Sequence, residues 1–171
     1  MPRGIRNNNP GNIEINRANA WEGRVPLQSN IDGRFEQFVS YDYGVRALII
    51  LLRNYINSGR NTINRVFAAY APPTENNTQQ YISFVSDRVN IGPDEILPLS
   101  KQVLKELTQA IARMENGRDC ISDKQFEAGW ALVPENIRSS IGQSLYVRSE
   151  GLLAYPLSAN ERALVVLIEN G

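Results

Sequence analysis

One amphipathic stretch of the chain is DYGVRALIILLRNYINS, residues 42–58. Its apolar residues recur at the three- and four-residue spacing of a helix, so they form one apolar face. Gly59 follows at once and is placed to end that helix. We therefore predict a central helix around which the other segments pack. Its apolar positions are Val45, Leu48, Ile49, Leu52, Tyr55 and Ile56.

Further helices are predicted beyond this stretch, because helical spacing recurs and capping residues mark the ends. Residues 12–39 differ, since their brief alternating pieces predict a small antiparallel ribbon. The predicted helices are about 62–70 behind an Asn61 cap, 78–89, 101–116 behind a Ser100 cap, one behind the capping box Ser122/Gln125, a short one around Ile137 and Ile141, and a last one behind the capping box Ser158/Glu161.

The fold class predicted from these elements is mainly α, with a small β part. A helical bundle surrounds the central helix, and the small ribbon lies at the N-terminus. At 171 residues the chain is near the usual size of a single domain, so we assign 1–171 to one domain with its own core.

Charge and composition exclude several functions. Lys and Arg number 18, as do Asp and Glu, so no net field attracts nucleic acid or an anionic membrane. Histidine is absent and Cys120 is the only cysteine. An intramolecular disulfide is therefore excluded, and we expect neither a metal site nor a cofactor. Any catalysis would use carboxylates, hydroxyls or amides.

The asparagine-rich stretch RGIRNNNPGNI, residues 3–13, is the first candidate site. Its Pro-Gly pair predicts a turn in which Gly11 is free to take a positive φ. The amides of Asn8, Asn9 and Asn12 offer donors and acceptors that suit sugar hydroxyls and N-acetyl groups. The alternative is a loop whose amides satisfy only its own backbone.

Glu115 is the carboxylate that stands out, because it lies at the last turn of an apolar helix. The negative end of the helix dipole raises the pKa of a carboxyl there, and a carboxyl that keeps its proton can serve as a general acid. The alternative is a solvated glutamate at a helix end. For Glu14 and Glu36, surface roles are the simpler interpretation, and Glu75 is interpreted as a helix-start residue.

An ordered series of motifs runs through the first two thirds of the chain. The motifs are RGIRNNNPGNI at 3–13, Trp21-Glu22-Gly23, Phe35 and Phe38, YGVRA at 43–47, Asn61-Thr62-Ile63, APPTENNTQQYI at 71–82 and Glu115-Asn116-Gly117. This series resembles a family of phage and prophage virion proteins, often described as structural proteins with a lytic-transglycosylase-like domain. The resemblance covers about residues 3–118, and residues 119–171 form a helical extension without a counterpart. At position 77, where the family pattern leads us to expect Asp, this chain has Asn, which argues against a second carboxylate there.

The chain is also similar, more weakly, to peptidoglycan glucosaminidases. In those enzymes a helix ending in the catalytic Glu precedes an Asn-rich loop, whereas here the Glu-bearing helix follows the loop at 100–117. This order implies a circularly permuted lysozyme-like fold that returns Glu115 to the Asn loop.

The resemblance implies a peptidoglycan-degrading glycosidase that cleaves glycan strands between N-acetylmuramic acid and N-acetylglucosamine. Glu115 would be the single catalytic acid, as in lytic transglycosylases and lysozymes. Tyr81 and Thr78, one helical turn apart, would face the cleft, and Trp21 would stack on a sugar beside Asn8, Asn9 and Asn12. The alternative for Tyr81 and Trp21 is a core position.

Two other classes of function stay open, a non-catalytic virion structural or assembly protein and a glycan-binding module. The expected partners are peptidoglycan strands and other phage virion or tail proteins. No apolar run approaches the ~20 residues of a membrane span, and the start is polar, so we expect neither a signal peptide nor membrane insertion. The protein would be made in the bacterial cytoplasm and reach the wall by a virion, a holin or a secretion system.

Overall fold

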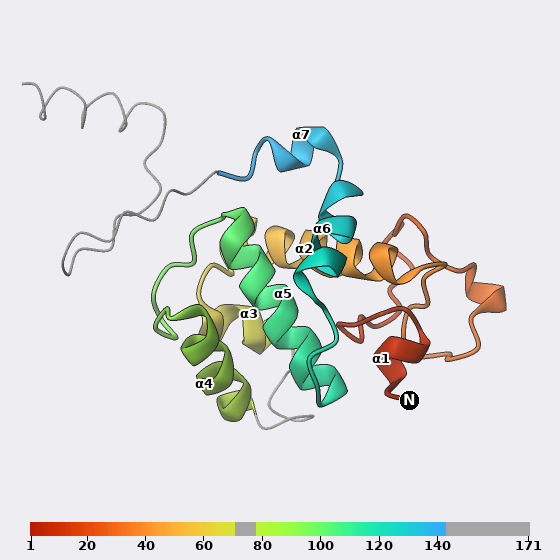
Figure 1. The fold of residues 1–171 in the computed structure, drawn as a ribbon, viewed down its shortest axis with the longest axis horizontal. Coiled ribbons are helices and arrows are strands. Elements are labelled where there is room, and N and C mark those ends of the chain that lie inside the picture. Colours follow the sequence, from red (N-terminus) through yellow and green to blue (C-terminus); the bar gives the residue numbers. More distant parts are fainter. Residues whose placement is uncertain (71–77, 143–171) are drawn as a thin grey trace, which may run out of the picture.

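The computed structural model describes residues 1–70 and 78–142 and is mainly α-helical (Figure 1). The predictions for Glu75, Asn77 and the helix behind Ser158 lie outside these residues. The helices are α1 Arg3–Arg6, α2 Tyr41–Asn57, α3 Ile63–Tyr70, α4 Thr78–Val89, α5 Lys101–Asn116, α6 Asp123–Ala131 and α7 Glu135–Arg138, with a 3-10 turn, η1, at Leu27–Ser29.

Helix α2 is the centre of the fold, as the sequence predicts. It contacts α3, α5 and α6, while α4 packs on α3 and α5. Figure 1 shows α5 crossing α2, with α3 and α4 on one side and the N-terminal segment on the other. The predicted apolar face is buried at Val45, Leu48, Ile49, Leu52 and Ile56, and Tyr55 packs at its edge.

The ends of α5 and α6 confirm the capping predictions made for these two helices, whereas at the start of α3 the side chain that accepts from the Arg65 amide is that of Thr62, not of Asn61 as predicted. The Ser100 hydroxyl accepts from the Val103 amide, and Gly117 ends α5 with φ of 70°. Both halves of the capping box of Ser122 and Gln125 are formed. Local polar chemistry therefore sets the limits of these two helices.

The predicted N-terminal ribbon is not formed as strands. Among the described residues, segment 12–39 has only two isolated antiparallel bridges, Glu14 with Phe35 and Arg24 with Phe38. Asparagine and aspartate side chains take backbone partners that a ladder would use: the amide nitrogen of Asn9 donates to the Glu36 carbonyl, and Asp32 accepts from the Phe35 amide. Such local bonds compete with regular strand pairing.

None of the described helices is both long enough and apolar enough to cross a bilayer.

Two glycines let other segments approach α2 closely. A Cβ on Gly44 would overlap the Asn8 carbonyl oxygen, so this glycine admits the N-terminal loop against the start of α2. A Cβ on Gly129 would lie 2.5 Å from Cγ1 of Val45, so this glycine lets α6 contact α2. Both distances are shorter than the contacts that real Cβ atoms make.

We expect Gly44→Ala and Gly129→Ala each to destabilise the protein. Alanine favours a helix by about 1 kcal/mol over glycine, but overpacking a tight contact costs about 1–3 kcal/mol, so the steric term dominates. Denaturant unfolding measures both. Gly142→Ala is the control, since a Cβ there would meet the Leu99 carbonyl at an ordinary 3.6 Å. Equal stability of all three variants would contradict the close packing.

Candidate functional site

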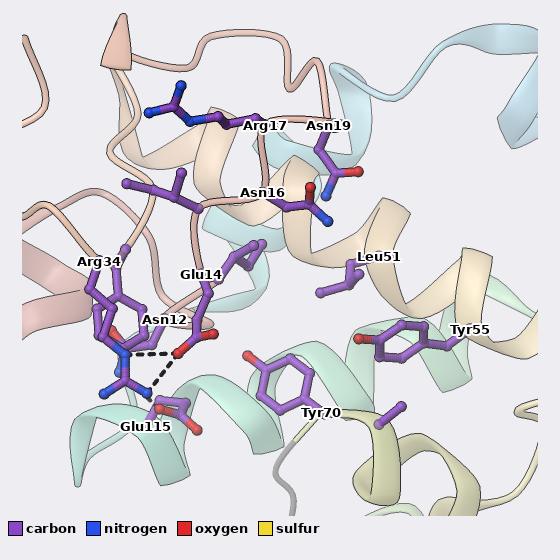
Figure 2. Close-up of a pocket in the computed structure, with 14 residues that line it drawn as sticks. Asn12, Glu14, Asn16, Arg17, Asn19, Arg34, Leu51, Tyr55, Tyr70 and Glu115 are labelled. Atoms are coloured by element: carbon purple, nitrogen blue, oxygen red, sulfur yellow. Dashed lines mark hydrogen bonds and ion pairs between the residues drawn. The ribbon is translucent and has the colours of Figure 1, made fainter. Parts of the chain in front are cut away.

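A pocket of about 540 Å³ lies between the N-terminal loop and the ends of α3 and α5 (Figure 2). The loop supplies one wall, α2 and α3 supply two tyrosines, and α5 supplies Glu115. Its lining is Asn12, Ile13, Glu14, Ile15, Asn16, Arg17, Asn19, Arg34, Phe35, Leu51, Tyr55, Ala69, Tyr70 and Glu115.

Glu115 meets the asparagine loop directly. The side-chain amide nitrogen of Asn12 donates to Oε2 of Glu115 at 2.8 Å, across 103 positions of sequence. The expected proximity of Glu115 to the loop is therefore confirmed. Burial is the largest influence on this carboxyl and raises its pKa, while the Asn12 hydrogen bond acts in the opposite direction. The result is a carboxyl that holds its proton to a higher pH than an exposed glutamate.

Asn116, the next residue, attaches the end of α5 to the loop. Its buried amide nitrogen donates at 2.8 Å to the carbonyls of Pro10 and Ala112. Gly4 lets this side chain lie against α1, since a Cβ there would be 2.6 Å from Oδ1 of Asn116. The position of Glu115 is thus fixed through its neighbour in sequence.

Asn8 and Asn9 hold the loop in shape and do not line the pocket. Asn9 is fully buried, donates to the carbonyls of Ile13 and Glu36, and accepts from the Ile13 amide. Asn8 donates to the Phe38 carbonyl at 3.0 Å. The alternative interpretation of the loop, in which amides satisfy its own backbone, describes these two residues.

The turn geometry also differs from the prediction for Gly11. Positive φ occurs at Asn8 (52°) and Asn12 (46°), whereas Gly11 is not among the described residues with positive φ. Asparagine tolerates the left-handed region better than other side chains do. Gly11 is needed for space instead, because a Cβ there would lie 2.8 Å from both Leu48 and Tyr70.

The remaining predicted residues lie outside the pocket lining. Trp21 is partly buried against the core. Thr78 and Tyr81 lie one turn apart on α4, as predicted, and Tyr81 packs on Phe67 with ring centroids 6.0 Å apart. Burial and then the Glu115 charge raise the pKa of Tyr81. Of the predicted residues, the structure brings Asn12 directly to Glu115.

Tyr70 and Tyr55 line the pocket although the sequence argument did not select them as site residues (Figure 2). The Tyr70 hydroxyl donates to the Gly11 carbonyl, and burial followed by the Glu115 charge raises its pKa well above the usual range. The sequence gives no sign that Tyr70 lines the pocket, because its contact with Gly11 forms only when α3 packs against the loop.

Glu14 and Arg34 also line the pocket, as an ion pair. Oε1 of Glu14 accepts from Nε of Arg34 at 2.8 Å and lies 2.7 Å from Nη2. The surface role predicted for Glu14 is therefore incomplete: its side chain is 57% exposed, but it faces the pocket. Glu36, for which a surface role was also predicted, is fully buried beside Arg24, so that prediction is wrong.

No group of three or more His, Cys, Asp or Glu side chains arranged to hold a metal occurs within residues 1–70 and 78–142.

We expect Glu115→Gln to raise the melting temperature at neutral pH. Since the folded pKa lies above the ordinary 4.5, the unfolded chain loses this proton first as pH rises, so the carboxyl reduces stability from that window upward. The gain should disappear below about pH 4, where both states are protonated. Thermal unfolding across pH measures it. A gain independent of pH would contradict the assignment.

No protein-family model matches the sequence. The chain is 33% identical to Protein P5 of Pseudoalteromonas phage PM2 over 131 residues. This aligned stretch covers 75% of this chain and 79% of the phage protein. An identity of this level over most of both chains indicates common descent. The chain therefore belongs to the family of this phage protein.

Proposed function

We propose that this protein is a phage-associated peptidoglycan glycosidase of the lytic-transglycosylase or lysozyme type. It cleaves glycan strands between N-acetylmuramic acid and N-acetylglucosamine, with Glu115 as the acid. The observation that carries the proposal is the half-buried carboxyl of Glu115, which faces a pocket and has a raised pKa. A glycosidase needs such a protonated carboxyl to donate to the leaving glycosidic oxygen.

The size and lining of the pocket suit sugars. Its volume of about 540 Å³ falls in the usual range of ligand pockets, roughly 300–1,000 Å³. Amides from Asn12, Asn16 and Asn19 provide uncharged donors and acceptors, and Tyr55 and Tyr70 add aromatic surface. Polar groups beside aromatic surface favour a carbohydrate over a purely apolar ligand.

The arrangement of the chain supports a permuted lysozyme-like fold as part of the same proposal. A helix that ends in a glutamate meets an asparagine-rich loop, with a central helix beneath them. This is the juxtaposition that the resemblance to lytic transglycosylases and glucosaminidases implies. It is an argument from likeness of arrangement, so the catalytic role rests on the residues themselves.

Kinship with a phage protein supports the substrate class, because a phage must pass the bacterial wall. Delivery by a virion, a holin or a secretion system would bring the protein to peptidoglycan. Other virion proteins are then further partners of this chain.

We expect Glu115→Gln to abolish the release of muropeptides from purified peptidoglycan, since glutamine has no proton to donate. Mass spectrometry of the digest measures the products and identifies the cleaved bond. Glu106→Gln is the matched control, being the same change about 13 Å along the same helix. Wild-type protein that binds the wall without releasing muropeptides would favour the glycan-binding or structural alternative.

The rate of cleavage should fall as pH rises through the raised pKa of Glu115, because only the protonated form is active. Turbidity loss of wall suspensions, followed with and without a chelator, measures this. We expect the chelator to have no effect, since a carboxylic acid cleaves glycosides without a metal. A rate unchanged from about pH 5 to about pH 9 would contradict the mechanism, since this range lies above the ordinary glutamate pKa of 4.5.

A further inference from the structure

Two carboxylates in different surroundings share the pocket. Glu115 is half-buried and receives a hydrogen bond from a neutral amide, that of Asn12. Glu14 is mostly exposed and is paired with the guanidinium of Arg34. Figure 2 shows the Glu14 side chain pointing from the loop toward the end of α5, where Glu115 lies. Burial favours a neutral carboxylic acid, and an adjacent cation favours a carboxylate.

The local backbone explains why Glu14 reaches this position. Ile13 is buried in the core, while Asn12 and Glu14 on either side of it line the pocket. The bridge between Glu14 and Phe35 places Arg34 alongside, and its guanidinium lies 5.0 Å from the Phe35 ring centroid. The ion pair is therefore oriented by the loop pairing that shapes the wall of the pocket.

We infer that Glu14 is a second catalytic carboxylate, which activates a water molecule so that this protein hydrolyses its glycan. This inference rests on the proposed function. Two carboxyl groups that line one pocket, here one beside a neutral amide and one beside a guanidinium, are the arrangement that glycoside hydrolysis uses.

The reaction balances as a hydrolysis. Glu115 donates its proton to the glycosidic oxygen as the bond from that oxygen to C1 breaks. The water oxygen bonds to C1 of the oxocarbenium-like sugar, and its proton passes to the Glu14 carboxylate. Solvent then returns Glu115 to its acid form and Glu14 to its carboxylate. Without Glu14, the sugar's own hydroxyl can close on C1 and leave an anhydro end.

The test is the ratio of reducing to anhydro ends in digests of purified peptidoglycan. Mass spectrometry separates them because they differ by one water. We expect the wild type to give mainly reducing ends. In Glu14→Gln we expect the yield of reducing ends to fall at least tenfold, while anhydro ends are still released. Glu127→Gln is the matched control, since Glu127 is 54% exposed, is paired with Lys101 and lies outside the pocket lining.

A second variant, Glu14→Ala, tests the same role by rescue. Sodium azide is small enough to enter the space left by the side chain and should restore turnover with a glycosyl azide as product. An unchanged ratio of ends in Glu14→Gln, only anhydro ends from the wild type, or no rescue by azide would overturn the inference and leave the proposed function standing. No turnover by the wild type would overturn both.

Discussion

The hydrogen bond from Asn116 to the carbonyl of Pro10 is the contact on which the arrangement of the pocket depends. It joins positions 106 residues apart and is buried. If the amide were removed, the Pro10 carbonyl would lose its partner out of reach of water, at a cost of about 1–3 kcal/mol. Together with the Asn12 hydrogen bond to Glu115, this contact holds the end of α5 against the loop and so keeps the two sides of the pocket together.

The asparagine side chains around the pocket have two different roles, which depend on where each lies. Asn9 and Asn116 are buried and spend their hydrogen bonds on backbone carbonyls, which gives the loop a fixed shape. Asn12 lies at the edge of that shape, with a positive φ that turns its side chain toward Glu115. The rigid part of the loop therefore positions the part that contacts the pocket.

The helices were predictable because their signals are local. The apolar spacing of α2, the Ser100 cap and the box of Ser122 and Gln125 act within a few residues of themselves. Glu115 could also be selected, since a carboxyl at a helix end next to Asn-Gly is visible in the sequence. The predicted ribbon was wrong, because Asn9 and Asp32 occupy backbone groups that its ladder would use, and the alternating pattern of 12–39 gives no sign of these bonds. Tyr70 and Glu14 face the pocket only through tertiary contacts.

The pKa of Glu115 depends on the burial of its carboxyl and also on the neutral charge of the Asn12 amide beside it. The Asn12 amide offers one hydrogen bond to the carboxyl, which lowers its pKa, but burial has the larger influence. A cation at the same distance would favour the carboxylate more strongly than this neutral amide does. Of the two arginines that line the pocket, Arg17 and Arg34, Arg34 is paired with Glu14. The loop thus supplies a neutral partner to one carboxyl and a charged partner to the other, so two carboxyl groups in the same pocket have different electrostatic surroundings.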